Sequence, residues 1–128
     1  MFRDAATEDP DSSLIVGIPK ALAGNIGEFH ESGHNVIFAA IALRAFDDHP
    51  VYATPSLVGG VRRLIESFDS SGGGRGYFGE ERGWMESDEV ALDDSVPEYD
   101  TLEDMATVVV NELLRSAQER RQGFGGPW

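Results

Sequence analysis

The sequence predicts a small, mainly α-helical domain of three to four helices with a long acidic loop. Apolar residues recur at helical spacing in three segments, and the residues that precede these segments are suited to cap a helix. No stretch alternates between apolar and polar residues as a half-buried strand would. The 128 residues suffice for one hydrophobic core. We expect a single domain over residues 13–122, between a disordered acidic N-terminus (1–12) and a flexible tail (123–128).

The first half of the chain contains one weak and one strong helical segment. Residues 13–23 are apolar enough for a short helix, although a glycine and a proline interrupt them. The strong helix is predicted to begin at Asn25, a good N-cap residue, because Glu28 three positions on can reach back to the amide of the cap. Residues 36–46 are apolar except for one arginine, so this helix should lie at the centre of the core.

Two amphipathic helices are predicted further along the chain. One starts at Thr54 and Pro55, with threonine as the cap and proline at the first helical position. Its inward stripe consists of Leu57, Val58, Val61, Leu64, Ile65 and Phe68. The last helix is capped by Thr101 with Asp104 and ends near Gln122. Its inward stripe consists of Leu102, Met105, Ala106, Val109, Val110, Leu113 and Ala117.

A long loop, residues 72–99, separates these two helices. It opens with a glycine run, and between Glu80 and Asp104 the chain holds eleven acids and one arginine, a composition typical of a solvated loop. An alternative for its first part is a short hairpin around Tyr77 and Trp84.

Acidic residues dominate the charge. The chain has 23 acidic and 10 basic residues, with Lys20 as the only lysine, and a formal net charge of −13. Such a surface repels phosphate backbones and anionic lipids, so we expect no nucleic-acid and no membrane partner. It also suits a cytoplasm rich in salt, where screening removes the self-repulsion, and we therefore expect a halophilic source.

Targeting signals and cysteines give little information about the location and the chemistry of the protein. The acidic start has no positively charged region followed by an apolar run, so a cytoplasmic location is expected. The longest apolar stretch, residues 36–43, is far shorter than the roughly 20 residues that span a bilayer. Because the chain has no cysteine, a transition metal would depend on His, Asp and Glu side chains.

The strongest chemical motif is His30-Glu31-Ser32-Gly33-His34, which fits the pattern H-E-x-x-H. On a helix, residues four apart lie one above the other, so both imidazoles would point at the same spot, as two ligands of one zinc ion require. Gly33 would cost about 1 kcal/mol in the middle of a helix, so we expect a close approach of another backbone or of a substrate there.

The six residues from Phe29 to His34, followed by an apolar helix, resemble the aromatic-His-Glu-Ala-Gly-His helix of the zincin superfamily. The likeness is greatest to the peptidase domain of the AAA+ membrane-linked zinc proteases, and it covers about a dozen residues. It implies that His30 and His34 bind zinc and that Glu31 is the general base that activates water. As the third ligand we expect Glu112, because Asn111-Glu112 resembles the Asn-Glu third-ligand motif of some zincins.

Three functions follow from these observations. The first is a zinc-dependent hydrolase of the metallopeptidase type, with a peptide substrate. The second is a non-catalytic helical packing or interaction module with a protein partner, part of a larger α/α assembly, in which His30 and His34 are hydrogen-bonded packing residues. The third is a metal-binding protein without catalysis. The sequence leaves the substrate and the oligomeric state open.

Overall fold

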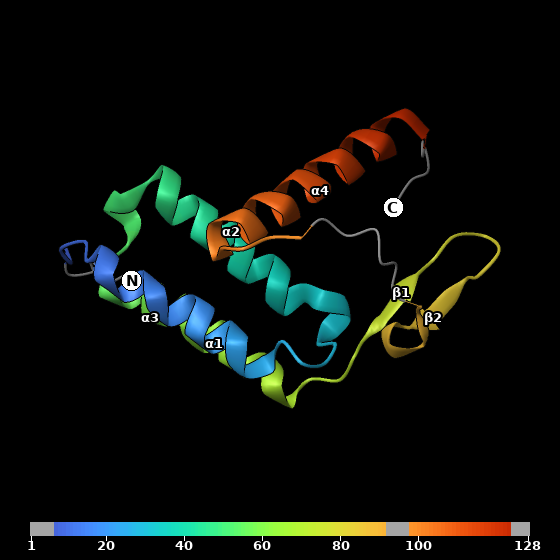
Figure 1. The fold of residues 1–128 in the computed structure, drawn as a ribbon, viewed down its shortest axis with the longest axis horizontal. Helices are drawn as coiled ribbons and strands as arrows, with labels where there is room; N and C mark the ends of the chain where they lie inside the picture. Colours follow the sequence, from blue (N-terminus) through green and yellow to red (C-terminus); the bar gives the residue numbers. More distant parts are fainter. Residues whose placement is uncertain (1–6, 92–97, 124–128) are drawn as a thin grey trace, which may run out of the picture.

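The protein is mainly helical, as predicted, and carries one small hairpin. The computed structural model describes residues 7–91 and 98–123, the last four of them without their side chains. Four α-helices lie within these residues: α1 (Gly17–Asn25), α2 (His34–Asp48), α3 (Pro55–Ser67) and α4 (Leu102–Gly123). Strands β1 (Arg75–Tyr77) and β2 (Trp84–Glu86) form an antiparallel pair after α3 (Figure 1).

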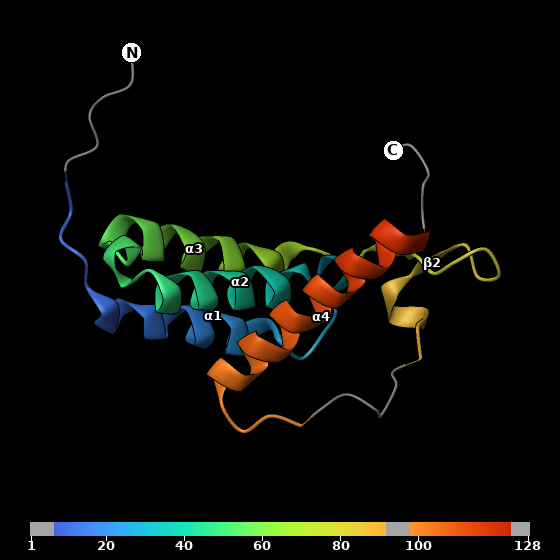
Figure 2. The same cartoon turned by 90° about the horizontal axis from the view of Figure 1, so that it is seen from above.

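Helices α1, α2 and α3 run alongside one another, and α4 crosses α2 (Figures 1 and 2). Helix α1 contacts both α2 and α3, which contact each other less closely. The core lies where the first three helices meet the start of α4. It consists of Ile18, Leu22, Ala39, Phe46, Ala53, Val58, Ile65 and Met105. The expectation that the helix containing residues 36–46 would be central is confirmed.

Local sequence signals explain the starts of α3 and α4. The Thr54 hydroxyl accepts a hydrogen bond from the Leu57 backbone N–H, and Pro55 occupies the first turn, where its missing N–H costs nothing. The Thr101 hydroxyl accepts from the Asp104 N–H and donates to the Asp104 carboxylate. Both predicted caps are confirmed.

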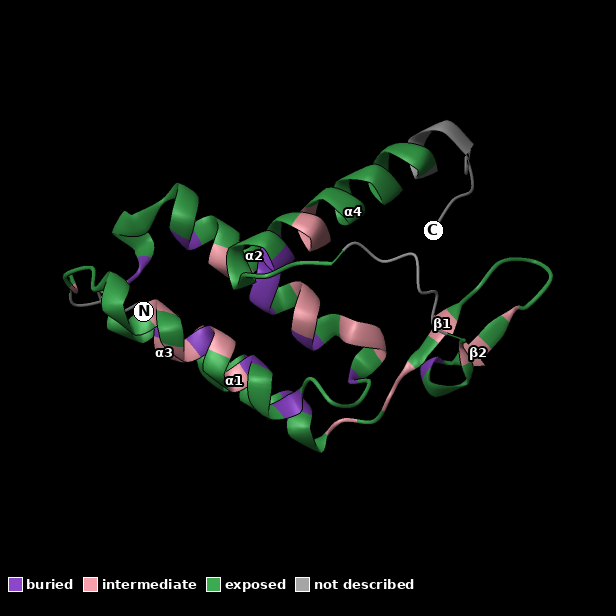
Figure 3. Ribbon diagram, viewed as in Figure 1, coloured by how far each residue is buried: buried purple, intermediate pink, exposed green. Residues whose placement is uncertain are grey.

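Helix α4 is covered along its first half only. Met105 and Ala106 are buried, whereas every residue from 111 to 119 is exposed (Figure 3). The apolar stripe predicted over the whole helix therefore continues past the point where α2 covers it.

The predicted start of the central helix at Asn25 is wrong. Asn25 is the last residue of α1, which follows a 3-10 turn over Ser12–Val16 and thus extends the predicted segment 13–23 by two residues. Helix α2 begins nine residues later, at His34. The side chain of Asn25 is buried and forms hydrogen bonds to α2 and α3 instead of capping a helix.

Two buried asparagines connect the first three helices. The Asn25 side-chain amide donates to the Ile65 carbonyl in α3 at 2.8 Å. The Asn35 side-chain amide donates to the Asn25 side-chain oxygen at 3.0 Å and to the Asn25 carbonyl at 3.2 Å. Both side chains are nearly inaccessible to water, so these bonds replace the hydrogen bonds to water that the side chains lose on folding.

The remaining chain is irregular. Between residues 7 and 11, the Glu8 carboxylate accepts hydrogen bonds from the backbone N–H and the hydroxyl of Ser56. Of the segment 1–12 that was predicted to be disordered, residues 1–6 lie outside the described residues. So do the tail after residue 123 and residues 92–97 of the acidic loop. Within the described part of the chain, no helix is both long and apolar enough to cross a membrane.

We predict that Asn25→Ala destabilises the domain by about 2–3 kcal/mol, because it removes the buried donor to the Ile65 carbonyl and one of the two acceptors of the Asn35 amide. Chemical denaturation followed by circular dichroism measures the change in the free energy of unfolding. Asn111→Ala on the exposed part of α4 is the matched control and should change stability by less than about 0.5 kcal/mol. Equal effects of the two substitutions would contradict the role given to the buried pair.

Candidate functional site

The H-E-x-x-H segment is not helical. His30 is extended, with φ −122° and ψ 115°. Glu31, Ser32 and Gly33 follow with positive φ values of 46°, 59° and 86°. Helix α2 starts only at His34. The prediction that His30 and His34 lie one turn apart on the same helix is therefore wrong.

Residues 30–33, which we call the strap, bond to the chain that leaves α3. The backbone N–H of Glu31 donates to the Gly72 carbonyl at 2.8 Å, and that of Ser32 donates to the Gly73 carbonyl at 2.6 Å. The Gly33 N–H closes a turn onto the His30 carbonyl at 2.9 Å. A helix through the strap would withdraw these N–H groups from their partners, so the tertiary bonds explain why the helix does not extend backwards.

The hairpin is attached to the same place. The Ser32 and Ser87 hydroxyl oxygens lie 2.6 Å apart, and the Ser87 N–H donates to the Gly74 carbonyl at 2.9 Å. A side chain at Gly74 would place its Cβ 2.8 Å from the Cα of Glu31, which is closer than real contacts allow. Gly74 thus permits the two backbones to approach each other.

Gly33 has a different reason for being glycine. The sequence predicted a close approach at this position, but a Cβ there would meet nothing within 4 Å. The backbone is left-handed, with φ 86°, and this conformation is costly for residues with a side chain. No other backbone approaches Gly33, so that part of the prediction is wrong, and the left-handed conformation accounts for the glycine.

The two histidines occupy different environments. His30 is buried, with 6% of its surface exposed, and its Nδ1 lies 3.2 Å from the Ser71 carbonyl oxygen. His34 is exposed, its Nδ1 contacts the Glu31 carbonyl oxygen, and its ring packs edge-on against Phe38 with centroids 5.8 Å apart. Zinc-binding imidazoles use a similar second bond to a carbonyl, so these bonds are compatible with both packing and metal binding.

The surrounding cavity does not bring the motif together. A pocket of about 370 Å³ beside the strap is lined by Gly24, Asn25, Gly27, Glu28, His30 and Asp69. Neither Glu31 nor His34 lines it, and Glu31 is exposed. A general base has to share a cleft with the water that it activates. The arrangement found here supplies one imidazole to this pocket and leaves the predicted base outside it.

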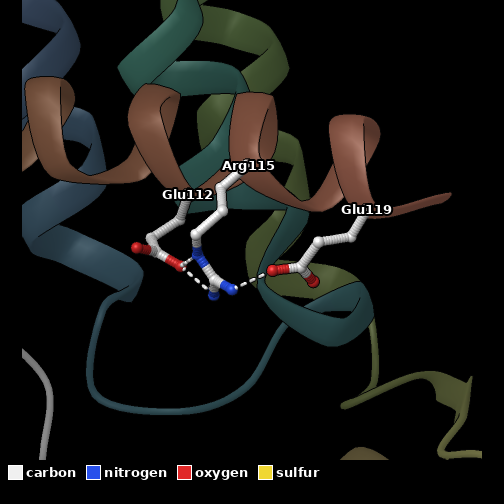
Figure 4. A network of polar contacts seen from close by, with 3 residues as sticks. All are labelled: Glu112, Arg115 and Glu119. Carbon is white, nitrogen blue, oxygen red and sulfur yellow. Dashed lines mark hydrogen bonds and ion pairs between the residues drawn. The ribbon is translucent and has the colours of Figure 1, made fainter. Parts of the chain in front are cut away.

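Glu112, the predicted third ligand, is engaged on α4 (Figure 4). Its carboxylate accepts from both Nε (3.0 Å) and a terminal nitrogen (2.5 Å) of Arg115, which also donates to Glu119 at 2.6 Å. The hydrogen bond from Arg115 lowers the pKa of Glu112, and the two carboxylates, Glu112 first, raise the pKa of Arg115. All three side chains are more than half exposed, so the network is a helix-surface ion pair of little energetic weight.

Within residues 7–91 and 98–123, no group of three or more His, Asp or Glu side chains is placed to hold a metal ion. His30, His34 and Glu112 as zinc ligands and Glu31 as the base stay predictions of the resemblance. The shared helix face on which that resemblance depends is absent from the strap.

Sequence reasoning missed the residues that the strap contacts. The sequence predicts that residues 72–74 begin a solvated loop, and it gives no role to Ser71 or Ser87. A signal was present in the glycines, because Gly33 and Gly74 are both in the left-handed region. The sequence alone does not distinguish this use of glycine from flexibility.

We predict opposite signs for two glycine-to-alanine substitutions. Gly33→Ala should destabilise the protein by about 1–2 kcal/mol because alanine is strained at positive φ. Gly60→Ala, within α3 and with open space around it, should stabilise by about 0.5–1 kcal/mol. Thermal or urea denaturation measures both. Stabilisation by Gly33→Ala would show that residue 33 lies inside a continuous helix, as the H-E-x-x-H interpretation requires.

We also predict that the protein, purified without chelators and supplied with zinc, contains far less than one zinc per chain. The physical reason is that placing both imidazoles on one helix face would need the strap to break its backbone bonds to residues 72 and 73. Elemental mass spectrometry of the wild type and of the double variant His30→Ala, His34→Ala checks this. About one zinc per wild-type chain, lost in the double variant, would establish the metal site instead.

Comparison of the chain with models of protein families, with curated proteins and with solved structures finds no match. The resemblance to zincins thus rests on the residues around the motif alone. Function has to be argued from the geometry of the fold.

Proposed function

We propose that the protein is a non-catalytic helical interaction module that binds a partner helix on the outer surface of α2 and α3. The supporting observation is an apolar groove between these helices. We call the surface around it the α2–α3 face and define it by Phe38, Ile41 and Ala45 of α2, Tyr52 of the connection, and Leu57, Val61 and Leu64 of α3.

Helical spacing places these residues on one stripe of each helix. Positions 38, 41 and 45 of α2 recur at intervals of three and four, and so do positions 57, 61 and 64 of α3. The core uses the neighbouring side of each helix, with Ala39 and Phe46 of α2 and Val58 and Ile65 of α3. Val61 also packs against the core, whereas the other stripe residues of both helices are apolar and exposed.

The groove is formed because α2 and α3 touch each other only lightly. It has a volume of about 280 Å³ and is lined by Ala42, Ala45, Phe46, His49, Tyr52, Leu57 and Val61. Two of the lining residues are alanines, while Phe38, Ile41 and Leu64 belong to the face outside the groove lining. Ile41 and Leu57 are each 47% exposed, Leu64 is 46% exposed and Tyr52 is 61% exposed.

A groove of this kind suits an amphipathic helix. Apolar residues at helical spacing on a partner can fill it as anchors, and the gain comes from removing apolar surface from water. Single exposed apolar residues are ordinary, whereas a contiguous patch along two helices is typical of a binding surface. The α2–α3 face therefore supports a binding function more directly than the strap supports a metal site.

We predict that the α2–α3 face binds a fluorescein-labelled amphipathic model helix of leucine, alanine and glutamine, whose uncharged side chains avoid a general attraction to the acidic surface. Ile41→Glu should weaken this binding by about tenfold or more, because it would bury a charge at the contact. Leu114→Glu, at an apolar position on α4 that is 57% exposed and receives the same charge, is the matched control and should bind like the wild type. Fluorescence anisotropy measures the affinity.

Both substituted side chains are exposed, so the unfolding free energy should change by less than about 0.5 kcal/mol and loss of binding cannot be ascribed to unfolding. Binding that Ile41→Glu leaves unchanged, or no binding to the wild type, would contradict a function of this face in recognising helices.

A further inference from the structure

We infer that the partner on the α2–α3 face is a second copy of this chain. The inference rests on the proposed function and adds the identity of the occupant. It depends on how charge is distributed along the sequence and on the shape of the face.

Charge on this chain is strongly segregated. Residues 34–67, which comprise α2, α3 and their connection, contain three acids and three arginines and so have no formal net charge. The whole net charge of −13 resides in the rest of the chain. Two copies repel each other wherever their acidic parts meet, and this repulsion is weakest where both present α2 and α3.

The charges of these two helices are moreover mostly paired within one copy. The Arg44 Nε lies 3.0 Å from the Asp48 carboxylate, and the Arg62 Nε lies 3.4 Å from the Glu66 carboxylate. Such exposed pairs add little stability, but they leave few free charges beside the face. A strongly charged partner would find little to recognise here, whereas a neutral apolar surface such as the same face of another copy fits.

The face is suited to pairing with itself. A connection of six residues joins α2 to α3, so the helices form a hairpin, and they run side by side (Figure 2). A twofold axis through the face would place Ile41 and Leu64 of each copy against the groove of the other. Such an isologous contact closes on itself as a dimer and gives a layer of four helices.

The size of the face sets the expected affinity. Five large side chains, namely Phe38, Ile41, Tyr52, Leu57 and Leu64, are each about 40–60% exposed. They offer roughly 400–500 Å² per copy, given about 150–250 Å² for a fully buried aromatic side chain and somewhat less for leucine. A standard interface buries about 800 Å² per partner, so we expect a weak dimer with a dissociation constant in the micromolar range.

Salt should strengthen this dimer. The copies carry the same large charge, and the Debye length falls from about 10 Å at about 0.1 M salt to about 3 Å at about 1 M. Screening weakens the repulsion between the acidic parts, while the apolar contact is kept. This response is opposite to that of a complex held by ion pairs between unlike charges.

Sedimentation velocity over a range of protein concentrations, at about 0.1 M and about 1 M sodium chloride, tests the inference. We expect a monomer–dimer equilibrium that shifts towards dimer in high salt. Ile41→Glu and Leu64→Glu should each weaken it by about tenfold or more, and Leu114→Glu, which adds the same charge on α4, should not.

A dimer that persists in Ile41→Glu and Leu64→Glu, or one lost in Leu114→Glu, would overturn the inference because another surface forms it. A wild type that is monomeric at every concentration and salt would overturn it too. In that case the model-helix measurement separates the two proposals: binding that depends on Ile41 leaves the interaction function standing with another partner, and no binding removes both.

Discussion

The hydrogen bonds between Asn25, Asn35 and the Ile65 carbonyl determine where the helices of this protein can begin and end. Polar groups in a core must be paired, and these three are paired in an arrangement where α1 ends at Asn25 and Asn35 lies in the first turn of α2. The chain between the two asparagines is then too short for another helix and too long for a tight turn. It becomes the connection that ends in the strap, whose backbone is paired with residues 72 and 73.

This constraint changes the meaning of the H-E-x-x-H letters. In a zincin-like helix the spacing of four residues brings two imidazoles onto one face. Here the same spacing spans an extended residue, three residues with positive φ and the first residue of α2. One imidazole is turned inward to a carbonyl of the chain after α3, while the other lies exposed beside Phe38. The motif thus links the connection between α1 and α2 to the chain that follows α3.

Features encoded locally could be predicted, and features that depend on distant partners could not. The start of α3 at Thr54 and that of α4 at Thr101 follow from side chains that bond within their own first turn, and the sequence contains both partners. Asn25 has the same side-chain chemistry, but its amide is used 40 residues away in sequence. Helix periodicity likewise predicted one stripe on α3 yet did not show that Ile65 faces the core while Leu64 is left outside. Ile65 is buried and Leu64 is exposed because of the way α1 packs against α3. This packing is a tertiary contact between segments that are separate in sequence.

The strap precedes α2 directly and the α2–α3 face lies further along the same helix, whose first turn is joined to α1 by the bonds between Asn35 and Asn25. The most direct measurement is backbone NMR of residues 28–36, combined with nuclear Overhauser contacts to residues 71–74. The account predicts positive φ at residues 31–33, contacts between Glu31 and Gly72 and between Ser32 and Gly73, and helical contacts that start at His34. Sequential helical contacts running unbroken from residue 28 to residue 36 would contradict it and would restore the helix that a zinc site requires.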